Sequence, residues 1–269
     1  MNTFASIQMD EEASKSCGIV NVWKSNMHTE IDAMSDLITD YPVVALDTEF
    51  PGVVIKNEQY YPNSTNTYNV VRGNVERTRL IQAGFSLFSK DGLQPPGTNT
   101  WQFNFEFTLG IDPIHHEAFA LLKKAGINFD RLSNEGVDRQ RFAERMLISG
   151  LLLNPDVKWL TFQGGFDFAY LLKLFSNLPL PLTRKEFDKE LKYYFCHCED
   201  LCELRNRCSL RGGLQTIADK LEIERKGVAH QAGSDSMITG LCFFKMRQLC
   251  ESWGIHTDSL ANQVHGLGC

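Results

Sequence analysis

The sequence predicts an α/β fold in which helices flank a mixed β-sheet. Strand-like segments near residues 43–49, 80–88 and 100–107 can pair antiparallel, and helical and strand-like segments alternate after residue 116. The apolar segments run from Val43 to Met246 without a linker rich in Gly, Ser or Pro. At 269 residues with 43% hydrophobic content, the chain can bury a substantial core. We therefore expect one domain.

Hydrophobic periodicity justifies each element in chain order. Residues 27–39 are predicted to form a helix, because Ile31, Met34 and Ile38 share one face, and this helix leads into the strand at 43–46. Residues 80–88 and 100–107 are predicted to form a hairpin, because the second segment alternates strictly and turn residues lie between the two. The remaining predictions are helices at 116–124 and 139–153, a strand at 159–162, and helices beginning at 167 and 235.

The two ends of the chain differ from the predicted domain, residues 19–252. Residues 1–18 are polar, with Asp10, Glu11 and Glu12 and no sustained periodicity, and are predicted to be a flexible tail. Residues 253–269 contain Gly254, Gly266 and Gly268 and are expected to be loose as well.

Composition narrows the function classes. A formal net charge of −6 argues against a protein that coats nucleic acid through a general basic surface. No segment approaches the length and hydrophobicity of a membrane span, and the N-terminus lacks the pattern of a signal peptide, so we expect neither a membrane nor a secreted protein. The 8 cysteines lack the density of a disulfide framework and fit reduced thiols in the cytosol or nucleus.

A pair of acids at a strand end is the first candidate site. Asp47 and Glu49 follow the apolar run at residues 43–46, and side chains at i and i+2 of a strand share one face. Such a pair can bind a hard divalent cation through oxygen ligands. The alternative interpretation is an acidic strand end that meets solvent.

Two further acids stand where helices are predicted to begin. Asp167 precedes apolar residues at helical spacing, and Asp235 opens another predicted helix, five residues after His230. Each acid alone could cap its helix, and His230 alone could be a loop histidine bonded to the backbone. A two-metal phosphoryl-transfer site, however, needs more than two carboxylates. The ordered set therefore favours one shared metal site over separate structural roles for these residues.

These residues and their surroundings resemble a known family. Asp47, Glu49, Asp167 and Asp235 with His230 are similar to the set of DEDDh exonucleases. Residues 45–53, 211–215 (Arg-Gly-Gly-Leu-Gln) and 230–236 resemble the Caf/Pop-type deadenylases, catalytic subunits of the Ccr–Not mRNA-decay complex. The resemblance extends from about Val20 to Glu251, nearly the whole chain.

The resemblance implies a fold, a mechanism and partners. It implies a single RNase H-like domain and a 3′–5′ exoribonuclease that shortens poly(A) tails and releases 5′-AMP. Asp47, Glu49 and Asp235 would hold one Mg²⁺ or Mn²⁺ ion, and Asp47 with Asp167 a second. His230 would be the general base, and Phe50, by adjacency, is a candidate substrate contact. The expected partners are the 3′ end of RNA and the large scaffold subunit of the complex, in cytoplasm and nucleus.

The chain also departs from the family pattern. The family usually has Phe-His-Ser-Gly-Tyr-Asp around the third acid, whereas Gln163, Gly164 and Phe166 stand here before Asp167. A second departure is the cluster of Cys196, Cys198 and Cys202, which could bind a structural Zn²⁺, although reduced thiols are the preferred interpretation because the spacing lacks two clean Cys knuckles.

Three alternatives stay open at this stage. The protein could be another DEDDh exonuclease acting on short RNA or DNA, or a scaffold subunit with a vestigial site. The aromatic stripe Trp101, Phe103, Phe105 and Phe107 could stack bases, but the preferred interpretation is sheet core.

Overall fold

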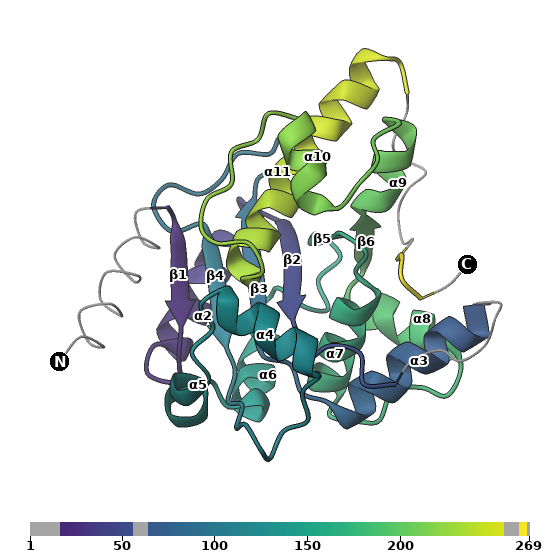
Figure 1. The fold of residues 1–269 in the computed structure, drawn as a ribbon. Coiled ribbons are helices and arrows are strands. Elements are labelled where there is room, and N and C mark those ends of the chain that lie inside the picture. Colours follow the sequence, from purple (N-terminus) through teal and green to yellow (C-terminus); the bar gives the residue numbers. More distant parts are fainter. Residues whose placement is uncertain (1–16, 56–63, 256–263, 268–269) are drawn as a thin grey trace.

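The computed structural model describes residues 17–55, 64–255 and 264–267 (Figure 1). In this part of the chain, one six-stranded sheet has the order β1-β4-β3-β2-β5-β6. Its strands are β1 (Ile19–Val22), β2 (Val43–Glu49), β3 (Gln82–Phe88), β4 (Thr100–Asn104), β5 (Lys158–Thr161) and β6 (His197–Asp200). β2, β3 and β4 pair antiparallel, whereas β1–β4, β2–β5 and β5–β6 are parallel. The predicted mixed sheet and hairpin are confirmed.

Helices cover both faces of the sheet (Figure 1). One face carries α9 (Leu201–Arg207), α10 (Leu214–Lys220) and the long α11 (Ala232–Ser252), which share a core with Val43 and Ala45 of β2. The other carries α2 (Met27–Leu37), α3 (Ser64–Arg77), α6 (Arg139–Leu147), α7 (Gly165–Ser176) and α8 (Arg184–Tyr194), which share a core with Val44 and Leu46. The shorter α4 (His116–Lys124) and α5 (Phe129–Glu135) enclose a smaller third cluster.

The aromatic stripe belongs to the core. Trp101, Phe103, Phe105 and Phe107 are each at most 1% exposed, so the structure supports core packing and leaves these rings no surface for stacking bases. Phe103 and Phe105 both pack edge-on against Phe142 of α6, with ring centroids 4.8 and 5.0 Å apart.

Several boundaries differ from the prediction. The helix predicted at residues 139–153 ends at Leu147, because the chain then turns so that Leu151 and Leu152 enter the core while Ile148 stays exposed. Periodicity also did not predict β1, α3 or α8. In α3 the chain is rich in Asn and Thr, so its helical state depends on the packing of Tyr68, Val71 and Val75.

The predicted tails have different outcomes. Residues 1–16 of the predicted N-terminal tail lie outside the described residues. Within the C-terminal segment predicted to be loose, Val264–Leu267 packs against the domain, and Leu267 is fully buried in the main core cluster. Among the described helices, none combines the length and hydrophobicity needed to cross a membrane.

Candidate active site at the end of strand β2

The alternation of β2 sends its acids and its threonine to opposite faces of the sheet. Asp47 and Glu49 follow the parity of Val43 and Ala45 and face the α11 layer, as predicted from their i, i+2 spacing. Thr48 faces the α7 layer, where its hydroxyl donates a 2.6 Å hydrogen bond to Asp167 Oδ1. The end of β2 therefore touches acids from both layers.

Asp167 reaches this strand end because β5 is short. β5 pairs with only Val43–Ala45 of β2, so the later residues of β2 have no β5 partner on that side. α7 begins at Gly165, just beyond β5, and carries Asp167 in its first turn. The buried Asp167 carboxyl lies near enough to Asp47 for the two charges to interact.

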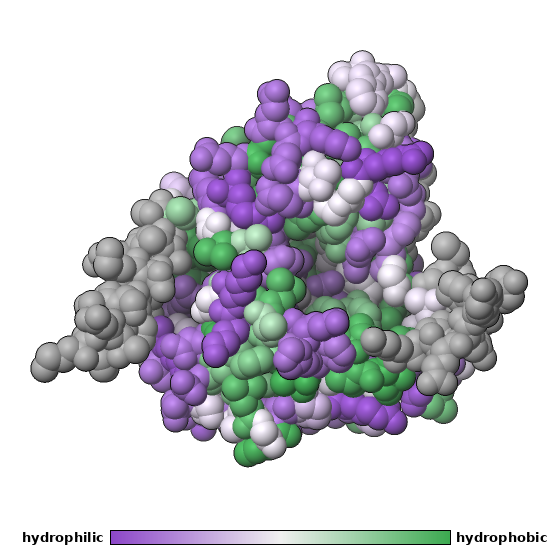
Figure 2. Space-filling view, in the orientation of Figure 1, coloured by the Kyte–Doolittle hydropathy of each residue, from purple (hydrophilic) through white to green (hydrophobic). Residues whose placement is uncertain are grey.

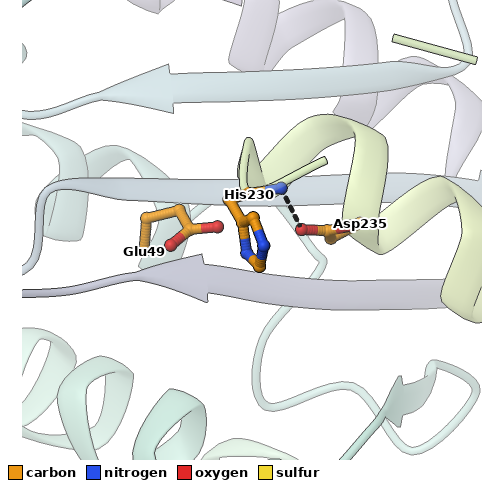
Figure 3. Close-up of side chains that lie close together, drawn as sticks. All are labelled: Glu49, His230 and Asp235. Atoms are coloured by element: carbon orange, nitrogen blue, oxygen red, sulfur yellow. Dashed lines mark hydrogen bonds between the residues drawn. The ribbon is translucent and has the colours of Figure 1, made fainter. Parts of the chain in front are cut away.

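Asp235 and His230 come from the start of α11. Asp235 lies in the first turn and accepts a 2.9 Å hydrogen bond from the backbone N–H of His230 at Oδ2. His230 has a left-handed φ of 63°, which is uncommon for a residue with a side chain. Its ring points between the carboxyl groups of Glu49 and Asp235 (Figure 3), and one ligand atom from each of the three residues lies within 4.8 Å of the others.

Polar side chains of the sheet hold the first turn of α11. On the face of β4 opposite the aromatic stripe, Gln102 accepts a 2.9 Å hydrogen bond from the N–H of Gly233 and donates one to Gln231. Gln82 of β3 accepts from the N–H of Ala232. The first amides of a helix lack hydrogen-bond partners within the helix, so these two glutamines cap the N-terminus of α11.

Gly84 allows α11 to approach this closely. It pairs with Asp47 across β2 and β3, and a Cβ at Gly84 would lie 1.9 Å from the carbonyl oxygen of Ala232. The atoms that this Cβ would meet belong to the backbone of α11, so no side-chain rotation can relieve the clash. Any side chain at Gly84 would push Asp235 and His230 away from β2.

Gly84→Ala is therefore expected to impair both folding and activity. Overpacking of this kind costs about 1–3 kcal/mol of unfolding free energy, and a displacement of about 1 Å in a site can cost about 10²-fold in rate. Urea unfolding and an RNA-trimming assay measure the two effects. Gly213→Ala is the matched control, because, apart from its chain neighbours, no described residue comes within 4 Å of a Cβ there. Wild-type trimming by Gly84→Ala would contradict this account of the helix position.

Burial and mutual repulsion make the acids of the site hard to ionise together. Burial raises the pKa of Asp47 well above its ordinary value, and the neighbouring carboxylates, first that of Asp235, raise it further. Burial, followed by Asp235 and Asp167, raises the pKa of Glu49 to about 8. Burial also raises the pKa of Asp167 to about 7, although the hydrogen bond from Thr48 opposes this shift.

The site fits divalent cations for this reason. Carboxylates are hard oxygen ligands of the kind that Mg²⁺ and Mn²⁺ prefer, and a nearby cation would favour their charged forms. In the described part of the chain, these acids form one ion pair, between Asp235 and Arg225. One guanidinium cannot balance the charge of four carboxylates.

Arg225 is a contact that sequence reasoning missed. Its Nη1 bonds Asp235 and donates to Ser234 Oγ at 2.9 Å, while its Nε donates to Gln215 Oε1 at 2.5 Å. Gln215 ends the Arg-Gly-Gly-Leu-Gln segment singled out in the sequence. The sequence signal for this contact was the 211–215 segment, because it places Gln215 on α10, where Gln215 accepts the hydrogen bond from Arg225.

The surface over the site is hollowed. In Figure 2, hydrophilic side chains gather over α10 and the segment that leads into α11, whereas hydrophobic surface appears lower, toward α4 and α7. The face is hollowed between these regions, where β2 and the start of α11 meet (Figures 1 and 2).

Comparison with known proteins identifies the family. The profile of the CAF1 family ribonucleases matches residues 22–145. The Schizosaccharomyces pombe protein "Poly(A) ribonuclease pop2" is 39% identical over 268 residues, which cover 99% of this chain and 80% of that protein. The chain belongs to the CAF1 ribonuclease family. "CCR4-NOT transcription complex subunit 7" of Caenorhabditis elegans is 37% identical over 264 residues, or 93% of this chain and 83% of that protein.

Solved structures of CAF1 relatives share the fold. S. pombe Pop2p in its Mg²⁺- and Mn²⁺-bound form superposes with a TM-score of 0.88 at 40% identity, covering 92% of this chain and 99% of that chain. The yeast CAF1 structure co-crystallised with the NOT1 MIF4G domain gives a TM-score of 0.78 at 27% identity, covering 92% and 96%. The predicted fold and family are confirmed.

The residues before Asp167 that depart from the CAF1 pattern form a constrained turn. Gln163 is exposed and has a left-handed φ of 58°, and a Cβ at Gly164 would lie 2.3 Å from Thr161 Oγ1. Phe166 stacks on Phe50, with ring centroids 4.8 Å apart. Phe50 is thus held beside α7 with one ring face covered.

The structure does not support the zinc site at Cys196, Cys198 and Cys202. Among the residues described, the one group of potential ligands gathered closely enough for a metal contains Glu49, His230 and Asp235, and no cysteine. Burial raises the pKa of the Cys202 thiol to about 12 and raises that of Cys198 as well, which disfavours the thiolates that zinc needs. None of the described cysteines forms a disulfide.

Proposed function

We propose that this protein is a poly(A)-specific 3′–5′ exoribonuclease that shortens mRNA poly(A) tails and releases 5′-AMP. The observation that carries the proposal is the meeting of Glu49, His230 and Asp235 at the strand end that also bears Asp47 and touches Asp167. Membership of the CAF1 family and 39% identity to a poly(A) ribonuclease support the choice of substrate.

Two divalent cations are part of this proposal. Asp47, Glu49 and Asp235 would hold one Mg²⁺ or Mn²⁺ ion, and Asp47 with Asp167 the other. When bound, such ions supply Lewis acidity that activates water and stabilises the leaving 3′ oxygen. The Mg²⁺- and Mn²⁺-bound form of Pop2p supports the choice of metal.

The side chains of the protein have distinct tasks in this mechanism. His230 takes the proton of the attacking water as general base, since a neutral imidazole ring carries a nitrogen that can accept a proton. The backbone N–H of His230 and the guanidinium of Arg225 both donate to the carboxylate of Asp235 and fix its position. Thr48 fixes Asp167 in the same way. Phe50, which is partly exposed beside Phe166, stacks the terminal base.

We also propose that the protein acts as a catalytic subunit of a Ccr–Not complex in cytoplasm and nucleus. The co-crystallisation of yeast CAF1 with NOT1 and the name of the C. elegans relative support a large scaffold subunit as the partner. The described cysteines, which form no disulfide, fit these reducing compartments. Co-purification with the scaffold subunit from separate cytoplasmic and nuclear extracts tests the partner and the location together.

An RNA with a mixed-sequence 5′ body and a 3′ run of A tests the activity. With a 5′ label and Mg²⁺ or Mn²⁺, we expect a ladder that shortens by single nucleotides and stops at the body, together with 5′-AMP. Chelation should stop the reaction. Equal trimming of the body or of DNA would identify a broader exonuclease instead. Failure to cleave any substrate or to bind metal would leave a scaffold subunit.

A further inference from the structure

A buried carboxylate outside the proposed catalytic set joins three segments of the chain. Asp200 at the end of β6 is 3% exposed. Its Oδ1 accepts hydrogen bonds from the backbone N–H groups of Gln163 at 3.1 Å and Cys202 at 3.0 Å. Its Oδ2 accepts from those of Gly164 at 3.0 Å and His265 at 3.1 Å. Asp200 thus ties the turn before α7 to the start of α9 and to the C-terminal segment.

The C-terminal strap, Val264–Leu267, closes against the same turn. Leu267 is fully buried in the core cluster that includes Phe168 of α7. His265 Nε2 lies 2.5 Å from the carboxyl oxygen of Glu203, which fixes the strap to α9. A Cβ at Gly165 would lie 2.8 Å from the carbonyl carbon of Gly266, so the strap touches the first residue of α7 directly.

This arrangement bears on the site because the fixed turn lies directly before Asp167. Gln163 adopts its left-handed φ without the freedom of glycine, a conformation that persists when the surroundings hold it. The amides of Gln163 and Gly164 are held by Asp200, and Gly165 is covered by the strap. Loss of either restraint would free the end of α7 that carries Asp167.

We infer that Asp200 and the C-terminal strap are positioning elements that hold Asp167 in its place beside β2. The inference rests on the proposed role of Asp167 as a metal ligand. It gives the C-terminal residues a part in catalysis although the strap contributes no residue to the proposed metal ligands. Asp200 acts through the backbone of the turn, so its effect should appear as loosened metal binding.

Asp200→Asn tests the first element. Each carboxylate oxygen accepts two N–H groups, so an amide nitrogen in either orientation would face two donors. We expect the Mn²⁺ dissociation constant, measured by calorimetry, to rise at least about 10-fold, in line with losses of supporting contacts around metal ligands. The turnover number should fall by a similar factor while KM for RNA stays unchanged, and excess Mn²⁺ should restore turnover.

Leu267→Ala tests the strap, and Met34→Ala is the control for a merely structural loss. Met34 is fully buried in α2, so its truncation should lower the unfolding temperature and leave Mn²⁺ affinity unchanged. If Asp200→Asn or Leu267→Ala binds Mn²⁺ as tightly as Met34→Ala, the inference is overturned. If the wild-type protein itself neither binds Mn²⁺ nor trims RNA, the proposed function fails first, and the two failures are distinct.

Discussion

Asp47→Asn should lower the rate of poly(A) trimming by about 10³-fold or more, because loss of one electrostatic stabiliser of a transition state already costs about 10²–10³. Asp47 is the acid that the proposed mechanism assigns to both cations, and it interacts with three neighbouring carboxylates. The same substitution should raise the unfolding temperature of the metal-free protein at pH 8. The asparagine cannot ionise, so it removes the cost of placing this charge among other acids.

An RNA-trimming assay checks the rate, and thermal unfolding without Mn²⁺ checks the stability. Calorimetry gives the Mn²⁺ affinity of each variant. Asp40→Asn is the matched control, since Asp40 is exposed in the turn that leads into β2 and should leave rate, metal affinity and stability unchanged. Trimming at the wild-type rate by Asp47→Asn would remove the acid from the mechanism. A lower unfolding temperature without metal would show that the repulsion argument is wrong.

His230→Ala should slow trimming by about 10²–10⁴-fold, the usual contribution of a general base. The substitution removes the ring that points between Glu49 and Asp235 but retains the backbone N–H that bonds Asp235 (Figure 3). The carboxylates should therefore stay in place, and Mn²⁺ affinity should remain at the wild-type value.

The Mn²⁺ affinity of this variant decides whether His230 is a general base or a metal ligand. A ring nitrogen of His230 is close enough to oxygens of Glu49 and Asp235 to bind the same cation. If His230→Ala lost Mn²⁺ affinity together with rate, the residue would be a ligand and the general base would have to be sought elsewhere. His197→Ala is the control, because His197 is exposed on β6 and should behave as wild type in both assays.

Hydrophobic patterns predicted the four inner strands, β2 to β5, and the starts of the helices that carry acids, but not the edge strands β1 and β6. The strict alternation at residues 100–107 correctly indicated a buried aromatic face, and the apolar run before Asp47 correctly indicated a buried strand. α8 escaped notice although Thr183 and Glu186 form a capping box, a local signal that was available. α3 had no comparable signal, because its polar sequence becomes helical through tertiary packing.

The contacts that orient the candidate site were less predictable than the acids themselves. Thr48, Arg225 and Asp200 act through partners 119, 10 and up to 65 residues away in sequence. Such pairings depend on strand lengths and helix approach, which no single segment encodes. Gln102 left a faint signal, since a buried polar residue in a central strand needs a partner.

The acids of the site come from both faces of the sheet, which makes the activity sensitive to proteolytic cleavage. Asp167 arrives with α7 from one layer, and Asp235 arrives with α11 from the other. A protease cut between these helices would leave two pieces, each with an incomplete ligand set. If the pieces drift apart by a few ångströms, hydrolysis stops while most helices and strands persist. Catalytic loss should therefore precede any change in circular dichroism during limited digestion.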